Sequence, residues 1–370
     1  MPLQSRYSQS PCGGSAATQR RSGMSKRIVF MGAGAVGGYV GGHFARIGED
    51  VTLIDPWPEH IEYIKHNGIH LSGTQGEHTV RLKALHLHEV QSLFKEPVDI
   101  AFICTKSYDT EWATMMIKQY LAPDGFVVSL QNSINEERIA NIVGWGKVVG
   151  CIASTIGVDA YKAGHVMRTR QPGGSTYTIF RVGEVHGRIT PRVLDIVRML
   201  SVIDSAKATT NLWGERWGKL TQNSMGNGIS ACTGMNSRAM TEWETSRRLS
   251  IRLAGEAIKV GQALGYEIEP ISKMPAEKWV TASEGDPAAL EEMEGVMLDG
   301  LKRMTEEGRP STGQDMLKGR RTEIDFLNGL VAAKGEEVGI PAPTHAALTE
   351  VVKRVERGEI EAHPRNVETL

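Results

Sequence analysis

The residues with the clearest chemical purpose are three glycines in the pattern Gly32-x-Gly34-x-x-Gly37. They follow an apolar run at residues 28–31 that predicts a buried strand, and a helical pattern begins at residue 38. Such a turn lets a pyrophosphate reach the backbone and directs the N–H groups of the helix start at the phosphates. The turn residues predicted to bind a dinucleotide are Gly32, Ala33, Gly34, Ala35, Val36 and Gly37.

Asp55 strengthens this interpretation over an incidental glycine-rich turn. It ends a second apolar run, residues 51–54, and lies about 20 residues past the glycines, where the pattern places an acid that binds ribose. A carboxylate there accepts hydrogen bonds from both ribose hydroxyls and repels a 2′-phosphate. No Lys or Arg follows before Lys65. We therefore predict NAD(H) as the preferred cofactor. NADP(H) is the alternative if a Lys or Arg from elsewhere in the chain folds over the site.

Polar side chains also follow two further predicted strands, residues 99–104 and 126–130. Lys106 follows one of them and Asn132 the other. Ligands of open α/β sheets bind outside the carboxyl ends of the strands, so Lys106 could pair with an anion and Asn132 could orient a carboxylate or amide. Each is equally consistent with a helix cap or a solvated loop residue.

Two groups of polar residues stand out in the C-terminal part. Lys219, Asn223 and Asn227 are spaced i, i+4, i+8, which predicts one face of one helix. If the segment after residue 310 is helical, Ser311 and Asp315 share a face, with Glu323 about a quarter-turn away. A structural alternative stays open for the second group, because Ser311 with Gln314 also fits a capping box.

The elements that must position these residues fall into two parts. Up to about residue 206 the chain alternates strands with helices, including a strand at 148–153 and a helix at 136–142, which predicts a parallel sheet covered on both faces. Residues 155–184 are expected to close this sheet with antiparallel strands, and from about residue 211 the pattern is helical. The predicted fold class is α/β: a Rossmann-like doubly wound sheet over residues 25–208, followed by an all-helical domain over residues 209–370.

Residues 1–24 are polar and rich in Ser, Gly and Gln, so we predict a disordered leader outside the fold. Arg6, Arg20 and Arg21 occur there without an acid, which leaves an organelle transit peptide as the alternative to a translated leader. The translated leader is favoured because Arg20 and Arg21 lie together at one end, and because Pro11, Gly13 and Gly14 would break the amphipathic helix of a transit peptide.

Composition excludes several classes of function. A net charge of −1 gives no electrostatic reason to expect nucleic acid or an anionic membrane as partner. No apolar run approaches the ~20 residues of a membrane span. The four cysteines are scattered without a Cys-x-x-Cys pair, and the 11 histidines show no metal-ligand spacing. We therefore expect a cytoplasmic protein without a metal site.

Taken together and in order, the motifs resemble the ketopantoate reductase family. They are the glycine turn, Lys106, Gln131-Asn132, Lys219-x3-Asn223-x3-Asn227, and Ser311-x3-Asp315-x7-Glu323. The resemblance spans about residues 27–356 and ends with Gly339-Ile-Pro341-x-Pro343 before a last helix. It implies a Rossmann domain joined to an all-helical domain, with the site in the cleft between them.

The resemblance also implies a reaction and residue roles. The reaction would be nicotinamide-dependent reduction of a 2-keto acid, either 2-dehydropantoate or another one. Lys219 would be the general acid, and Glu323 would organise Lys219 and the cofactor. Lys106 and Asn132 would also lie beside the cofactor. The residues that would bind the substrate are Asn132, Asn223, Asn227, Ser311 and Asp315. Hydride addition to a carbonyl builds negative charge on its oxygen, which an ammonium group stabilises and protonates.

Two positions depart from the family pattern. Ser133 stands where the family usually has Gly after Gln-Asn, and the usual NADP-selecting arginine after the second strand is absent. Family members that make pantothenate precursors mostly use NADPH, so the second departure favours a different 2-keto acid. Ser133, with its side chain in place of glycine, would narrow the pocket or reshape its loop.

Two other classes of function stay open. One is another two-domain dehydrogenase, of the β-hydroxyacid or opine type, and the other is a non-catalytic dinucleotide sensor. The pattern of Lys219, Asn223 and Asn227 counts against the first, and a sensor would have no use for Lys219. The expected partner is a small 2-keto acid, and a helical domain of this size also commonly offers a surface for a homodimer.

Overall fold

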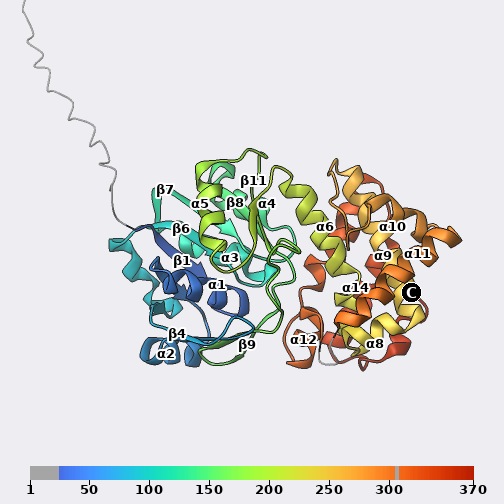
Figure 1. Ribbon diagram of the computed structural model, residues 1–370, viewed down its shortest axis with the longest axis horizontal. Coiled ribbons are helices and arrows are strands. Elements are labelled where there is room, and N and C mark those ends of the chain that lie inside the picture. Colours follow the sequence, from blue (N-terminus) through green and yellow to red (C-terminus); the bar gives the residue numbers. More distant parts are fainter. Residues whose placement is uncertain (1–24, 305–307) are drawn as a thin grey trace, which may run out of the picture.

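The computed structural model describes residues 25–304 and 308–370. The predicted leader, residues 1–24, lies outside the described residues. Figure 1 shows the strands gathered in the blue-to-green half of the molecule and helices alone in the yellow-to-red half. No helix in the described ranges is long and apolar enough to span a bilayer.

The main sheet has eight strands in the order β12-β11-β8-β7-β6-β1-β2-β5. All neighbours are parallel except β8 and β11. The strands are β1 (Arg27–Met31), β2 (Asp50–Ile54), β5 (Lys83–Leu85), β6 (Val98–Ile103), β7 (Leu121–Ser129), β8 (Val148–Ala153), β11 (Phe180–Glu184) and β12 (Ala206–Ala208). The chain runs outward from β1 through β2 and then returns to β6 on the other side of β1, so the strand order reverses at the carboxyl ends of β1 and β6.

Helices cover both faces of this sheet. They are α1 (Ala35–Arg46), α2 (Pro58–Asn67), α3 (Thr110–Lys118), α4 (Glu136–Val143) and α5 (Pro191–Leu200), with short 3-10 turns η1 (Leu87–Lys95), η2 (Ser107–Asp109) and η3 (Trp145–Lys147). One hydrophobic core joins the sheet to α1 and α5, and a second joins its other face to α3 and α4. The prediction of a doubly wound α/β sheet followed by helices is confirmed.

A second, four-stranded sheet was not predicted. Its order is β4-β3-β10-β9, from β3 (Ile69–Gly73), β4 (His78–Val80), β9 (Val158–Lys162) and β10 (His165–Arg168). Residues 155–184 were expected to close the main sheet, and for β9 and β10 this is wrong: only β11 joins the main sheet. β10 instead pairs in parallel with β3, a distant segment whose partnership no local pattern reveals.

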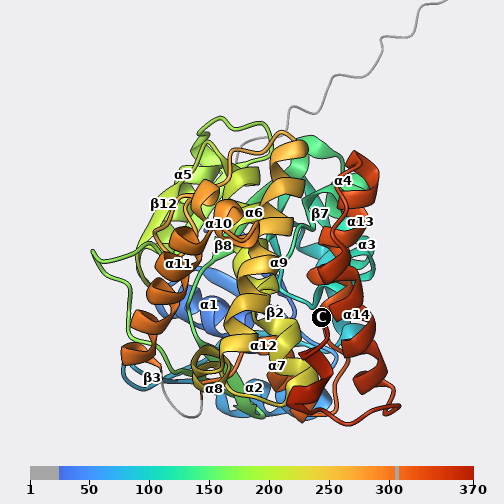
Figure 2. The same ribbon diagram turned by 90° about the vertical axis from the view of Figure 1, so that its right-hand side faces the viewer.

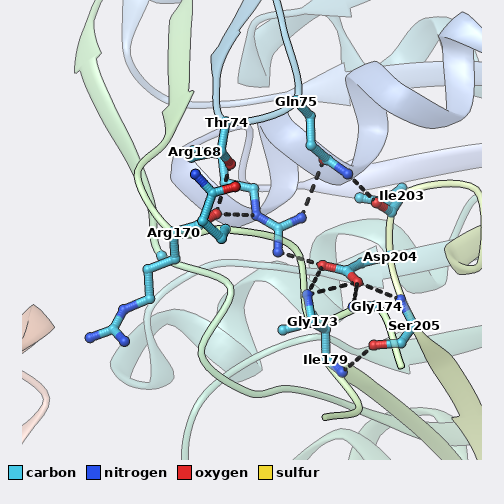
Figure 3. A network of polar contacts seen from close by, with 12 residues as sticks. Thr74, Gln75, Arg168, Arg170, Gly173, Gly174, Ile179, Ile203, Asp204 and Ser205 are labelled. Carbon is cyan, nitrogen blue, oxygen red and sulfur yellow. Dashed lines mark hydrogen bonds and ion pairs between the residues drawn. The ribbon is translucent and has the colours of Figure 1, made fainter. Parts of the chain in front are cut away.

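A buried ion pair ties the small sheet to the edge of the main one (Figure 3). The Arg168 side chain donates from Nη2 to Asp204 Oδ2 at 2.5 Å and from Nη1 to Gln75 Oε1 at 3.2 Å. Asp204 also accepts the N–H groups of Gly173 and Ser205 at 3.1 and 2.7 Å. Burial alone would raise the pKa of Asp204, but these hydrogen bonds, with Arg168 foremost, hold that pKa below its usual value.

The second half of the chain forms helices around α9. They are α6 (Leu212–Ser224), α7 (Asn227–Thr233), α8 (Ser237–Glu242), α9 (Glu244–Ala263), α10 (Ala276–Ser283), α11 (Pro287–Asp299), α12 (Ser311–Leu317), α13 (Asn328–Val338) and α14 (Pro343–Glu356), with η4 (Gly300–Arg303), η5 (Ile324–Phe326) and η6 (Pro364–Val367). Figure 2 shows α9 running through the middle, with α10 and α11 on one side and α13 and α14 on the other. α6 lies nearest the sheet half in Figure 1 and packs against both α9 and β11.

Candidate active site

The glycine turn is shaped for close approach of a ligand to its backbone. Gly32 has φ +98°, and its N–H donates to the Ile54 carbonyl at 2.8 Å. A Cβ on Gly37 would lie 1.9 Å from the Gly32 carbonyl oxygen, so only glycine lets α1 pack this close. A Cβ added to Gly34 would meet no atom within 4 Å, so the space beside this residue is open. No side chain caps the start of α1. The N–H groups at the start of α1 are thus available to a pyrophosphate. The geometry of the turn is compatible with the predicted dinucleotide-binding role.

Asp55 lies directly beside this turn. Its carboxylate accepts the Ala33 N–H at 2.7 Å through Oδ2 and the Trp57 N–H at 2.9 Å through Oδ1. Each oxygen keeps a lone pair that can accept a ribose hydroxyl. Lys65, the first Lys or Arg after Asp55 in the sequence, already pairs with Glu62 at 3.2 Å and with Glu89 at 2.7 Å.

His60, which the sequence did not single out, forms a hydrogen bond with the glycine turn. Its Nε2 lies 2.9 Å from the Ala33 carbonyl oxygen, and its Nδ1 accepts the Gly164 N–H at 2.9 Å. These two bonds require the neutral tautomer with the proton on Nε2. Burial lowers the pKa of His60, although the charge of Asp55 opposes this. His60 therefore adds no positive charge beside Asp55.

Lys106 joins two carboxylates from the helical half. Its ammonium contacts Asp315 Oδ2 and lies 3.4 Å from Glu323 Oε2. Burial opposes the charge on Lys106, but Glu323 and Asp315 outweigh it and raise the pKa of Lys106. Burial likewise raises the pKa of Asp315, and Lys106 offsets only part of that rise. Glu323 Oε1 accepts both the N–H and the hydroxyl of Ser107, each at 2.8 Å.

Two details of the predicted helix faces are wrong. α6 ends at Ser224 and Asn227 begins α7, because Gly226 between them has φ −130°, outside the helical region. Likewise α12 ends at Leu317, so Glu323 does not share a helix with Ser311 and Asp315. The capping-box alternative for Ser311 also fails, since Pro310 is the N-cap residue and no side chain caps α12.

The predicted amide residues nonetheless meet in two pairs. Asn223 Nδ2 donates to Asn132 Oδ1 at 3.4 Å, which joins α6 to the loop after β7. Asn227 Nδ2 donates to Ser311 Oγ at 3.4 Å, which joins α7 to α12. Both contacts are long, so these donors remain available to a ligand carboxylate or hydroxyl.

Lys219 lies one helical turn before Asn223 on α6, half-buried. Among the described residues, its ammonium has no hydrogen bond and no ion pair, including with Glu323. Burial lowers the pKa of Lys219 to about 8, and the positive charges of Arg170 and Arg181 contribute. An ammonium group with this pKa can hold its proton at neutral pH and still release it readily.

Arg216, also missed from the sequence, anchors α6 on the sheet. Its guanidinium donates to Glu136 Oε1 at 2.7 Å, to the Gln131 carbonyl at 2.7 Å and to the Ser129 carbonyl at 2.8 Å. Both charged side chains are at most 2% exposed. The carbonyls belong to the end of β7 and the loop that carries Asn132. No local sequence signal singles out this pair, since Glu136 is followed by two further charged residues and Arg216 directly follows another.

Ser133, the first departure from the family pattern, has φ +66°, a conformation that favours glycine. Its hydroxyl donates to the Phe326 carbonyl of η5. The serine thus ties the loop of Asn132 to the helical half.

The described residues hold no group of three His, Cys, Asp or Glu side chains that could bind a metal ion.

This arrangement brings the glycine turn, the Asp55 carboxylate, neutral amide donors and an ammonium without a partner in the described chain to the same edge of the sheet. Residues 28–179 match the family described as "Ketopantoate reductase PanE/ApbA", and residues 211–356 match "Ketopantoate reductase PanE/ApbA C terminal".

Individual proteins are also similar to nearly the whole chain. A 2-dehydropantoate 2-reductase from Archaeoglobus fulgidus is 30% identical over 339 residues, which cover 90% of this chain and 99% of the relative. A crystal structure of a PanE/ApbA family ketopantoate reductase from Ralstonia eutropha has 25% identity and a TM-score of 0.73, with 90% and 99% of the two chains covered. D-mandelate dehydrogenase with NADH and anilino(oxo)acetate shares the fold at 22% identity, a TM-score of 0.74 and coverage of 90% and 98%. The motifs, the two-part match and this similarity along nearly the whole chain show that the protein belongs to the ketopantoate reductase family.

Proposed function

We propose that this protein reduces a 2-keto acid to the 2-hydroxy acid with a nicotinamide cofactor, and that Lys219 is the general acid. The observation that carries the proposal is the environment of Lys219: half-buried, without an acidic partner in the described part of the chain, and with a pKa lowered to about 8 by burial and neighbouring arginines. A structural lysine at such a place would be expected to have a carboxylate partner.

The cofactor supplies the hydride when bound. Gly32–Gly37 and the start of α1 would hold its pyrophosphate, and Asp55 its ribose. As charge builds on the substrate's carbonyl oxygen, the Lys219 ammonium stabilises it and then gives up a proton. Asn132, Asn223, Asn227 and Ser311 would orient the 2-keto acid through neutral donors that leave the charge of Lys219 intact.

Lys106 and the two acids would complete the site. Glu323 contacts both Lys106 and Ser107, which supports a positioning role toward the cofactor. Asp315 would help to keep Lys106 protonated, because its negative charge raises the pKa of Lys106. We assign residues 25–208 to the cofactor domain and residues 209–370 to the substrate domain, with the cytoplasm and a homodimer as further expectations.

We propose NAD(H) as the preferred cofactor, because neither of the two basic residues that follow Asp55 most closely in the described chain offers a free positive charge. Lys65 is paired with two acids, and His60 is held neutral by its hydrogen bonds. The relatives' name makes 2-dehydropantoate the leading substrate, with another 2-keto acid as the alternative. The matches to both segments of one family favour this function over a β-hydroxyacid or opine dehydrogenase.

The test is a panel of 2-keto acids, 2-dehydropantoate among them, assayed with NADH and with NADPH. Initial rates at subsaturating concentrations identify the substrate and cofactor with the highest kcat/KM. We expect turnover of at least one branched 2-keto acid. Tight binding of NADH or NADPH, seen by fluorescence, without oxidation by any member would instead indicate a non-catalytic dinucleotide sensor.

A further inference from the structure

Arg138, on α4, joins the segment after β6 that carries Lys106 to the segment after β7 that carries Asn132. Its Nη1 donates to the Ser107 carbonyl at 2.5 Å and to Asn135 Oδ1 at 3.0 Å. Ser107 and Asn135 are both fully buried. Since Nη1 carries two hydrogens, it can donate to both acceptors at once. The guanidinium thus fixes the two segments against each other.

Asn135 extends this connection to the predicted site. Its Nδ2 donates to the Asn132 carbonyl at 2.9 Å and to Ser107 Oγ at 3.3 Å. A guanidinium has donors and no acceptor, so Arg138 holds Oδ1 of the amide toward itself and thereby turns Nδ2 toward Asn132. The Thr110 hydroxyl also donates to Oδ1, at the longer distance of 3.3 Å. The orientation of Asn135, and with it the Asn132 backbone, therefore depends mainly on Arg138.

Arg138 also contacts the helical half. Its Cζ lies 4.7 Å from the centroid of the Phe326 ring, within the range of a cation–π contact. Phe326 is the last residue of η5, and its carbonyl accepts the Ser133 hydroxyl. Glu323, directly before η5, accepts both the N–H and the hydroxyl of Ser107. Both ends of η5 therefore dock on the two segments that Arg138 joins.

The contact of Arg138 with an acid is the weakest of its interactions. Nε lies 3.5 Å from Glu111 Oε1, and the Glu111 side chain is 57% exposed. An exposed ion pair of this length contributes little to stability. The guanidinium instead bonds a backbone carbonyl and an amide oxygen and lies over a ring, each on a different segment. This arrangement suits the holding of three segments in register.

We propose that Arg138 is a positioning residue of the site, which fixes the placement of Asn132 and Lys106 relative to Glu323. This inference rests on the proposed function. Without the guanidinium, the segments after β6 and β7 and η5 lose the one group that contacts all three. A displacement of about 1 Å at an active site can cost about 10²-fold in rate, even when the substituted residue lies away from the chemistry.

The first test measures kcat and KM of Arg138→Met and Arg138→Lys with the best 2-keto acid of the panel at saturating NADH. Methionine keeps an apolar stem but cannot donate a hydrogen bond. We expect Arg138→Met to lower kcat/KM for the 2-keto acid about 10- to 100-fold, and Arg138→Lys, which keeps a charged donor, to recover part of the loss. Glu111→Gln removes only the exposed partner of the same arginine and should retain wild-type kcat/KM. Unchanged kcat/KM in Arg138→Met overturns the inference.

A double variant tests the link to the helical half. Phe326→Leu removes the ring under the guanidinium, so its loss and that of Arg138→Met should share one cause. We expect Arg138→Met/Phe326→Leu to lose less kcat/KM than the product of the two single losses. Each variant is assayed at a temperature at which circular dichroism shows it folded, so that an unfolded fraction cannot account for the loss. A double variant that loses the full product contradicts the three-way link.

A further measurement does not need turnover. Oxamate, an unreactive analogue in which an amide replaces the ketone, is titrated calorimetrically into the NADH-loaded wild-type and Arg138→Met proteins. Binding about tenfold weaker in the variant, with the Kd for NADH within a few-fold of the wild-type value, supports the positioning role even if no 2-keto acid is reduced. Equal oxamate binding in the two proteins, or none in either, contradicts it. Absence of turnover in the wild-type protein, by contrast, argues against the proposed function itself.

Discussion

At the scale of single residues, Lys219 differs from Lys106 in having no acidic partner within the described part of the chain. Lys106 and Lys219 are both predicted site residues, yet their pKa values move in opposite directions. Two carboxylates raise the pKa of Lys106, whereas burial and two arginines lower the pKa of Lys219. The first is therefore a fixed charge, and the second is suited to proton transfer.

This contrast predicts the pH dependence of the reaction. kcat/KM for 2-keto acid reduction should be constant at neutral pH and fall about tenfold per pH unit above about pH 8, because in the proposed mechanism only protonated Lys219 donates. Oxidation of the 2-hydroxy acid needs the neutral amine, so its kcat/KM should rise over the same range. The measurement is a pH series in both directions, with NADH affinity as the control. Profiles that are flat from about pH 7 to 10 would remove Lys219 from this role.

Asp55 predicts the cofactor preference. At an effective dielectric of ~20, two like charges ~4 Å apart repel by several kcal/mol, enough to reverse a preference between NADH and NADPH. We expect a higher kcat/KM for NADH in the wild-type protein, and a selective gain with NADPH in Asp55→Ala. Glu59→Ala, in the first turn of α2, is the control for loss of a nearby acid. A wild-type protein that favours NADPH contradicts this reasoning.

At the scale of elements, α6 matters most, since it carries Lys219 and Asn223 and reaches the sheet through Arg216. The Arg216–Glu136 pair is almost fully buried, so each charge depends on the other. The carbonyls of Ser129 and Gln131 take up the remaining guanidinium donors. The position of Lys219 opposite the strand ends thus depends on one buried side chain.

We expect Arg216→Met to lower the free energy of unfolding by about 3–5 kcal/mol, because it leaves the Glu136 carboxylate buried without a partner. The double variant Arg216→Met/Glu136→Gln should recover part of this loss. Arg198→Met, which removes an arginine whose ion pairs are exposed, should cost at most about 1 kcal/mol. Urea titrations measure all three. Equal losses for Arg216→Met and Arg198→Met would show that the buried pair does not anchor α6.

Local pattern was sufficient for most elements and failed where distant segments meet. The apolar runs located β1, β2, β6, β7 and β8, since buried parallel strands read as continuous apolar segments. The helix break at Gly226 and the end of α12 before Glu323 were missed, because residue spacing alone does not show where a helix ends. The small sheet was missed since β10 pairs with β3 across a long stretch of chain.

At the scale of the whole molecule, the site exists only where the two halves meet. Lys106 and Asp315 are 209 residues apart in sequence, and Ser107 and Glu323 are 216 apart. The resemblance to a known family named Lys106, Asp315 and Glu323 but not Ser107. Spacing could not show that Glu323 contacts Lys106 and Ser107 and has no contact with Lys219 in the described structure. Ser133 adds a further tie through the Phe326 carbonyl. Substrate and cofactor would therefore bind against both halves at once.

The most direct test of the central claim is the kcat of Lys219→Ala, measured with the best 2-keto acid of the panel at saturating NADH. We predict a loss of about 10²- to 10⁴-fold, the usual contribution of a general acid, with the Kd for NADH nearly unchanged. Lys118→Ala, at the exposed end of α3, serves as the control and should retain wild-type activity. A Lys219→Ala protein that keeps its kcat within a few-fold of the wild-type value would contradict the account.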